Sequence, residues 1–457
     1  MRRHRIPARA VWVVLGLTPG CATYTPAPLD PPQVLQRLAA TEWAPIGATT
    51  TTTGDDGPRP VGPKELAAFA VATNPQLLSV RAEIGVRDAL LVEAGLLPDP
   101  ELSWDAMNNV ASQVVTGDSS SVDTISGLGL MFPLLRPGER GARVGAAEWR
   151  IEEARRLIAA AEWTLTRDIH VAYQEVIGSE ILLAQTVALT TLAGSTNDYF
   201  ERAREAGAAT AIQANLALGE LQSIRLDGVR AEARARQARQ ALNGLLGLPP
   251  DAEVLLRNGE TPSASEYLRT GTDELTSHAV EARPDLSVLL ARYEVAEENV
   301  RLAVAKQYPL IAIGTGISIS LPIFSKFGRP AMRTAIAERA RLAVEFTAAV
   351  HSVREEIAAA HVLWQLAQRE VELVEQQLLP TAERNIELSR AAFQAGEVTL
   401  LETLALQRAL VEARTRQTET RAERSKRAWT LLAASGWLLG PETPTDTNDT
   451  TNEEDSE

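Results

Sequence analysis

Apolar side chains recur at helical spacing over two long stretches near the C-terminal end of the chain. Between residues 350 and 378 the spacing alternates between three and four positions, and residues 404–432 keep a similar frame with Arg408 as its one polar break. Sustained alternation of this kind is the heptad pattern of a coiled coil. The pattern therefore predicts two long helices that pack against each other. The first seam consists of Val350, Val353, Ile357, Ala360, Trp364, Ala367, Val371, Val374 and Leu378.

The reversal between these two helices is predicted within residues 381–410. Gly396 suits the left-handed turn that ends one helix, and Thr399 suits the cap of the next. An earlier pair of helices follows the same pattern, from about residue 140 to a turn at Gly207. Because no proline interrupts the first helix of that pair, we expect it to extend roughly 100 Å at 1.5 Å per residue.

A β-hairpin is predicted over residues 98–133, between two prolines. Residues 101–107 alternate between polar and apolar side chains, which is the period of a strand with two different faces. Residues 124–132 are the predicted returning strand. This first hairpin is long enough for two membrane-spanning strands, because each needs about 9–11 residues.

A second, much shorter hairpin is predicted over residues 309–322, where the bounding prolines lie 13 positions apart. Residues 310–313 and 317–321 can form a short ladder. Two crossings of a bilayer need more residues than this segment contains. We therefore expect the second hairpin not to span a membrane.

The same elements occur twice in the same order. A single offset shared by several landmarks indicates tandem duplication of a unit made of a helix, a β-hairpin and a long helical hairpin. We therefore expect a mainly α fold with a small β part. Three landmarks recur 189 positions later: Phe132-Pro133 at Leu321-Pro322, Gly207 at Gly396, and Gly247 at Gly436. The predicted divisions are 1–20 (signal peptide), 21–61 (extended lead), 62–250 (first repeat), 251–272 (connector), 273–440 (second repeat) and 441–457 (disordered acidic tail).

The N-terminus has the order of an export signal. Four arginines precede a short apolar run over residues 10–17, which is too short for a transmembrane helix. Cys21, the only cysteine, follows directly after Gly20, so no intrachain disulfide is expected. The preceding residues resemble a bacterial lipobox, although Leu17 lies one position further from the cysteine than usual. We expect Cys21 to be lipidated; the alternative is a signal-peptide cysteine without a role.

Charge and residue types argue against several classes of function. The formal net charge is −14, which does not favour binding to nucleic acid. The histidines are scattered, and no HExxH motif or Cys/His cluster has metal-ligand spacing. Gly314-Thr-Gly falls within a predicted strand, so it does not indicate a phosphate-binding loop. We expect no enzyme activity, no metal and no cofactor.

Several motifs together resemble the TolC-type outer-membrane efflux proteins over residues 64–438. Each motif alone is weak, but their order and their duplication are typical of that family. The resemblance rests on Asn74-Pro75, Leu97-Pro98, Phe132-Pro133, Tyr308-Pro309, the segment from Ile319 to Phe324, the segment from Leu379 to Glu383 and the segment from Ala392 to Glu402.

This resemblance implies a homotrimer whose helices form a periplasmic tunnel, or α-barrel. In the family, four strands per subunit jointly close a twelve-stranded barrel in the outer membrane. The implied role is the outer-membrane channel of a tripartite efflux or secretion system, whose partners are a periplasmic adaptor and an inner-membrane pump. The implied location is the outer membrane, with a lipid anchor and most of the chain in the periplasm.

The resemblance also implies site residues at the two helical turns. Glu402 falls on the first of two acidic positions that narrow the tunnel aperture in the family, whereas Ala405 replaces the second. The alternative is that Glu402 is an ordinary solvated carboxylate. The turns themselves would receive the adaptor, at the residues Arg204, Gly207, Gly396, Glu397 and Thr399.

The short second hairpin departs from the family pattern. We expect a reduced β-barrel, formed either by the first hairpins alone or by a sheet that stays at the periplasmic face. Two other classes remain open from sequence. A periplasmic adaptor usually has one helical hairpin rather than two, and a purely structural coiled-coil lipoprotein would not need the proline-bounded β-hairpins.

Overall fold

The computed structural model describes residues 24–39, 60–105, 127–257, 267–394 and 398–438. The chain divides into one unit of residues 1–42 and a second of residues 43–457. The first unit contains helix α2 (Pro31–Ala39). All other described helices and strands belong to the second unit, and it alone carries the features discussed below.

The first repeat places two short helices and two strands before a long helical hairpin. Asn74 separates the two short helices, because its side-chain oxygen accepts hydrogen bonds from the N–H groups of Gln76 and Leu77 at 2.9 and 3.0 Å. Pro75 follows at the first helical position, where its missing N–H costs nothing. The elements are α3 (Pro63–Thr73), α4 (Pro75–Gly95), β1 (Glu101–Asp105), β2 (Gly127–Leu134), α6 (Glu139–Glu205) and α7 (Ala211–Leu246).

The second repeat has the same order of elements, which confirms the duplicated unit. Pro284 opens α9 as Pro75 opens α4. The connector contributes one short 3₁₀ helix, η1 (Tyr267–Arg269). The elements are α8 (Thr272–Ala282), α9 (Pro284–Ala305), β3 (Leu310–Gly314), β4 (Ile317–Ser320), α10 (Arg329–Leu373), η2 (Val374–Leu378), α11 (Leu379–Gln394) and α12 (Leu400–Ala434).

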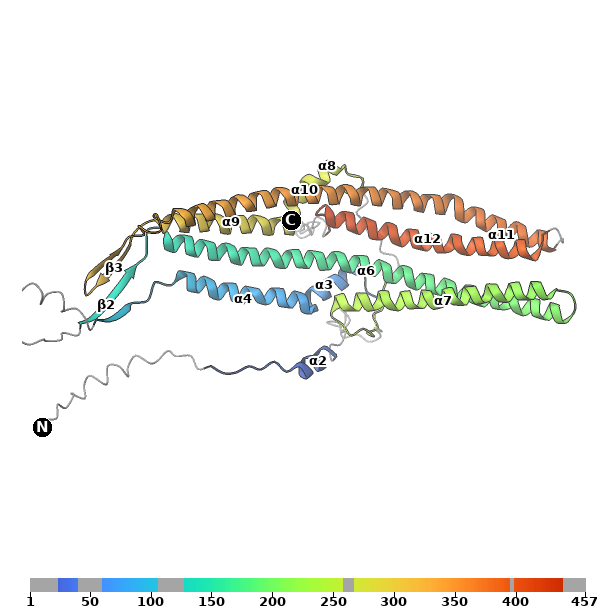
Figure 1. Cartoon of the computed structure of the whole chain (residues 1–457). Helices are drawn as coiled ribbons and strands as arrows, with labels where there is room; N and C mark the ends of the chain where they lie inside the picture. Colours follow the sequence, from blue (N-terminus) through green and yellow to red (C-terminus); the bar gives the residue numbers. More distant parts are fainter. Residues whose placement is uncertain (1–23, 40–59, 106–126, 258–266, 395–397, 439–457) are drawn as a thin grey trace, which may run out of the picture. The chain divides into compact units, whose positions relative to one another are not determined.

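Each repeat has its own hydrophobic core, and the two cores use equivalent positions. Leu66 in the first core and Leu275 in the second are both almost completely buried. Leu242 and Leu431, at the ends of the two helical hairpins, are buried in the same way. Helix α6 contacts α9 and α12 as well as α7 (Figure 1), so it joins the two repeats.

The predicted uninterrupted helix is α6, which has 67 residues and therefore extends roughly 100 Å. It begins just after strand β2 and ends at the turn that contains Gly207, so the sheet and that turn lie at opposite ends of it. Gly207 and Gly436 have φ angles of 73° and 85°, in the left-handed region that favours glycine. A side chain at Gly436 would also place its Cβ 3.0 Å from that of Ala282.

The second helical hairpin differs from the expected continuous helix. One turn of π-helix, η2, separates α10 from α11. The N–H of Leu379 donates to the carbonyl of Val374, five positions earlier. Pro380 follows at once, and a proline ring collides with the carbonyl four positions before it in an ordinary α-helix. The wider turn accommodates the proline while the apolar seam continues.

Strands from both repeats form a single antiparallel sheet in the order β1-β2-β3-β4. Strand β2 pairs with β3, so Phe132 lies opposite Ile313 and Leu134 lies opposite Ile311. The second hairpin is short, as the sequence predicted, because β3 and β4 share only four residue pairs, from Leu310–Ser320 to Ile313–Ile317.

The sheet has two different faces. The register of the strands places apolar side chains on one face across all four strands, since alternate residues of a strand share a face. Their exposed fractions lie between 37% and 75% in the single chain. The other face carries small residues such as Gly129, Ala312 and Ser318. The exposed apolar positions are Leu102, Leu130, Phe132, Leu134, Ile311, Ile313, Ile317 and Ile319.

Candidate functional site

The first helical turn is closed by hydrogen bonds within the chain. The N–H groups of Ala208 and Ala209 both donate to the carbonyl of Ala203, at 2.7 and 3.1 Å. Gly207, where the turn was predicted, directly precedes them and has a left-handed backbone. Arg204 is exposed next to this turn and forms an ion pair with Glu201 of the same helix at 2.5 Å. The turn is therefore rigid, and its charged side chains face solvent.

The second turn is described from Val398 onward, so Gly396 and Glu397 lie outside the described residues. Thr399 caps α12, as predicted, and its hydroxyl accepts the N–H of Glu402 at 3.3 Å. The Glu402 carboxylate in turn accepts the backbone N–H of Thr399 at 2.7 Å and its hydroxyl at 2.8 Å. This reciprocal pair is a capping box. Cys21, the remaining candidate residue, also lies outside the described residues.

The capping box favours the charged form of the Glu402 carboxylate. The carboxylate is fully exposed, and the hydrogen bonds from the backbone and hydroxyl of Thr399 hold the pKa of Glu402 below its usual value of 4.5. The first turn contains the same box with a neutral partner, because Thr210 pairs with Gln213. The helix after each turn therefore begins with the same capping box, but only the second box carries a negative charge.

The two helical hairpins contact each other close to these turns. Phe200 of α6 and Ala217 of α7 are buried, and Leu404 of α12 packs against them. This small cluster lies beyond both main cores. It joins α6 and α7 to the start of α12.

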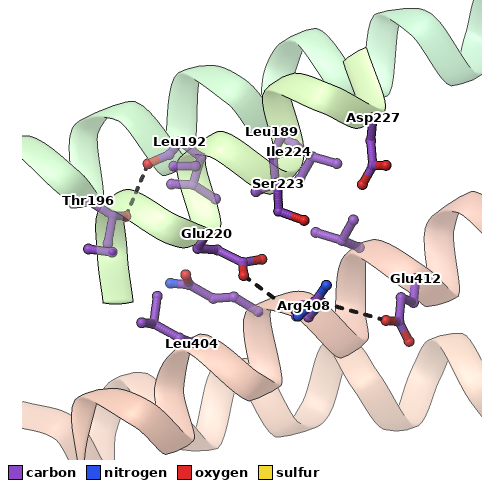
Figure 2. Close-up of a pocket in the computed structure, with 14 residues that line it drawn as sticks. Leu189, Leu192, Thr196, Glu220, Ser223, Ile224, Asp227, Leu404, Arg408 and Glu412 are labelled. Carbon is purple, nitrogen blue, oxygen red and sulfur yellow. Dashed lines mark hydrogen bonds and ion pairs between the residues drawn. The ribbon is translucent and has the colours of Figure 1, made fainter. Parts of the chain in front are cut away.

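A cavity of about 120 Å³ lies between the hairpins, next to this cluster (Figure 2). Arg408, which broke the apolar seam in sequence, enters the cavity from α12. Its guanidinium lies 3.7 Å from the carboxylate of Glu220 on α7 and 3.9 Å from that of Glu412 (Figure 2). The polar break is thus explained by an ion pair between the hairpins. The sequence pattern indicated Arg408, as a break in the apolar seam, but gave no sign of its partner Glu220.

A second group of charges joins α6 to α12 and α7. Lys426 of α12 donates to the Glu175 carboxylate at 2.8 Å, and Arg234 of α7 lies 3.0 Å from the same carboxylate. Burial lowers the pKa of Lys426, but hydrogen bonds to Glu175 and Glu423 raise it more, so the net shift is upward. Nothing in the sequence indicated this cluster.

The described residues offer little support for catalysis. Within the described part of the chain, no group of three or more His, Cys, Asp or Glu side chains is placed to hold a metal ion. His278 instead stacks on Trp437, and the His170 ring lies against Trp429 at a tilt of 48°. Both histidines form hydrogen bonds with backbone carbonyls.

Helix α6 contains a stretch that is long and apolar enough to cross a membrane. It contains a stretch of 18 residues with a mean hydropathy of 1.5, of which 17% are buried in the single chain. The helix packs against α7, α9 and α12. We therefore interpret this stretch as apolar surface to be covered by protein.

A duplicated helical hairpin that shares one four-stranded sheet is the fold of a TolC-like α-barrel channel of the outer membrane. The family model described as outer membrane efflux protein matches residues 67–248 and 275–437. The chain belongs to this family. It is therefore an outer-membrane efflux component with a large periplasmic portion.

Relatives and solved structures agree with this assignment. The cobalt-zinc-cadmium resistance protein CzcC of Cupriavidus metallidurans is 22% identical over 78% of this chain and 88% of its own. The pyoverdine export outer membrane protein OpmQ of Pseudomonas aeruginosa is 25% identical over 91% and 94%. A crystal structure of VceC from Vibrio cholerae has a TM-score of 0.65 at 18% identity, covering 82% of this chain and 96% of that one. The likeness to VceC, at this level of identity, shows a shared fold.

Proposed function

We propose that three copies of this chain form a periplasmic duct that receives substrate from an adaptor and an inner-membrane pump. The observation that carries this proposal is the apolar surface left open on the helices of a single copy. Val187 of α6, Val229 of α7 and Val362 of α10 have exposed fractions of 57%, 65% and 54%. Soluble monomers rarely expose extended apolar surface, and helical hairpins cover it by packing on further hairpins.

The proposed organisation keeps the sequence divisions. Residues 62–250 and 273–440 form the two repeats, residues 251–272 connect them, and residues 21–61 lead from the outer membrane. We also propose that Cys21 carries the lipid that anchors this lead. Loss of labelled fatty acid in Cys21→Ala tests the anchor, and an unlabelled wild type would contradict it.

The name of OpmQ refers to export and that of CzcC to resistance, and together the two names indicate no particular substrate. CzcC is named for cobalt, zinc and cadmium, whereas OpmQ is named for pyoverdine. The two have nearly equal identity to this chain. The proposal therefore concerns the duct and its partners.

Cross-linking of the adaptor to the helical turns in cells tests this function. Arg204→Glu and Glu397→Arg should together lower the yield of adaptor cross-linked in cells, because these charges lie at or next to the turns. Arg236→Glu is the matched control, since Arg236 is also exposed and also paired within its helix, but lies in the middle of α7. An equal loss from the control, or no loss from the pair, would contradict docking at the turns.

The charge at Glu402 gives a second prediction, for ion selectivity. In the proposed trimer, the three Glu402 carboxylates form a ring at the aperture. Glu402→Gln should remove this ring of charges while keeping the cap, because Gln213 already serves that purpose in the first turn. Reversal potentials in asymmetric KCl should show a cation preference in wild type that Glu402→Gln loses.

The pH dependence of this preference follows from the lowered pKa of Glu402. The carboxylate stays charged above its usual pKa of 4.5, so the preference should persist there and disappear only as the pH falls through the lowered value. Glu402→Ala loses both charge and cap. If Glu402→Gln behaves like wild type and only Glu402→Ala differs, the carboxylate acts as a cap alone.

A further inference from the structure

The turn that follows β4 is closed by hydrogen bonds and has an unusual backbone shape. Residues 321–328 join β4 to α10, and several backbone hydrogen bonds close the turn, including Phe327 N–H to the Pro322 carbonyl at 2.9 Å. The Ser325 hydroxyl donates to the same carbonyl, also at 2.9 Å. Lys326 and Phe327 have φ angles of 50° and 54°. They are the two non-glycine residues with positive φ among those the structure describes.

Positive φ is costly for a bulky residue, so this shape needs a reason. The equivalent turn of the first repeat runs from Pro133 to Gly138 and is one residue shorter than that from Pro322 to Gly328. In that first turn Arg136 folds inward, where it forms an ion pair with Glu139 at 3.2 Å. The second turn instead holds its aromatic and basic side chains outward.

The outward side chains continue the apolar face of the sheet. Phe324 is fully exposed, and Leu321, Ile323 and Phe327 are each about half exposed. Leu321 lies two positions after Ile319 and therefore extends the apolar row of β4 into the turn. The apolar face of the sheet thus ends in a projecting, preformed aromatic tip.

The tip lies in a basic segment of the sequence. Residues 299–337 contain five Lys and Arg side chains and no Asp or Glu, in a chain whose net charge is −14. Lys326, Arg329 and Arg333 are exposed. None of the three forms an ion pair with any residue in the described ranges.

We propose that residues 321–329 form a binding site for an anionic phospholipid of the periplasmic leaflet of the outer membrane. Ile323 and Phe324 enter the acyl region, while Lys326 and Arg329 contact the headgroup phosphate. Aromatic and basic side chains together are typical of a membrane interface. The core of a protein interface is depleted of charge, which disfavours a neighbouring subunit as the occupant. The inference rests on the outer-membrane location of the proposed duct.

A photoreactive side chain at position 324 identifies the occupant directly. Full-length protein carrying p-benzoylphenylalanine in place of Phe324 is irradiated in cells, and its mass is then measured. The expected product is the chain plus one phospholipid. The same replacement of Val344, which is exposed on α10, is the control and should give no phospholipid adduct. Cross-linking of position 324 to a second copy or to another protein would overturn the proposal.

The charge requirement is tested on the same labelled protein reconstituted into vesicles. Lys326→Gln with Arg329→Gln should reduce the adduct in phosphatidylglycerol vesicles by about five-fold per charge, and much less in phosphatidylcholine. Arg354→Gln, at an exposed position of α10, should leave the adduct unchanged. Equal adduct in both vesicle types with the wild-type charges would overturn the headgroup assignment. Protein found in the outer membrane without a lipid adduct refutes this site alone, whereas absence from that membrane refutes the proposed duct as well.

Discussion

Trimers of this chain reconstituted into a planar bilayer should lack the large, stable conductance of an open twelve-stranded duct. Strands β3 and β4 have five and four residues, so each extends roughly 13–17 Å at about 3.3 Å per residue. The hydrocarbon core of a bilayer is about 30 Å thick. Unpaired strand edges in lipid leave polar backbone groups without partners, so short strands cannot complete a wide barrel.

Single-channel recording measures this directly, on protein whose trimeric mass has been verified by native mass spectrometry. Exclusion of polyethylene glycols of increasing size then gives the width of the pore. A narrow pore would indicate that the first hairpins close a smaller barrel. A wide and stable pore in the unmodified trimer would show that the short second hairpin does not limit the barrel.

Replacement of Ile357 by alanine should lower the free energy of unfolding by about 2–5 kcal/mol. Ile357 is completely buried in the core of the second repeat, together with Leu286 and Leu432. The substitution removes three carbon atoms from a packed site, and the surrounding helices cannot close the resulting space fully. Denaturant unfolding in detergent, followed by circular dichroism, measures the change.

Ile336→Ala is the matched control for this substitution. Ile336 lies on the same helix, α10, but its exposed fraction is 40%. The same chemical change there should cost less than about 1 kcal/mol. Equal losses at the two positions would contradict the assignment of Ile357 to the core, because burial would then not distinguish them.

Local sequence patterns were sufficient for most of the helices and strands. The alternating spacing around Val353 and Ile357 predicted a long packed helix, and both residues are buried. Such a seam is a periodic property of neighbouring positions, so no distant contact is needed to recognise it. The same holds for Thr399 and Gly207, because capping and left-handed turns depend on a few adjacent residues.

Some features could have been read from the sequence but were not. Thr399 and Glu402 stand three positions apart, as do Thr210 and Gln213, and this spacing is typical of a capping box. The reciprocal contact gives Glu402 a structural role beside its proposed role at the aperture. Pro380 likewise signalled an irregularity within the predicted helix. The π-helical turn that accommodates it was hidden by the uninterrupted apolar seam.

The sequence by itself determined the duplicated order of elements, the lengths of the helical hairpins and the shortness of the second β-hairpin, because each depends on periodicity and on local turn residues. Only the tertiary structure decided that β2 pairs with β3 across the repeats and that Arg408 reaches Glu220. It alone placed Lys326 and Phe327 in the left-handed region. These features join segments distant in sequence or oppose local preference, so the packing of the whole chain sets them.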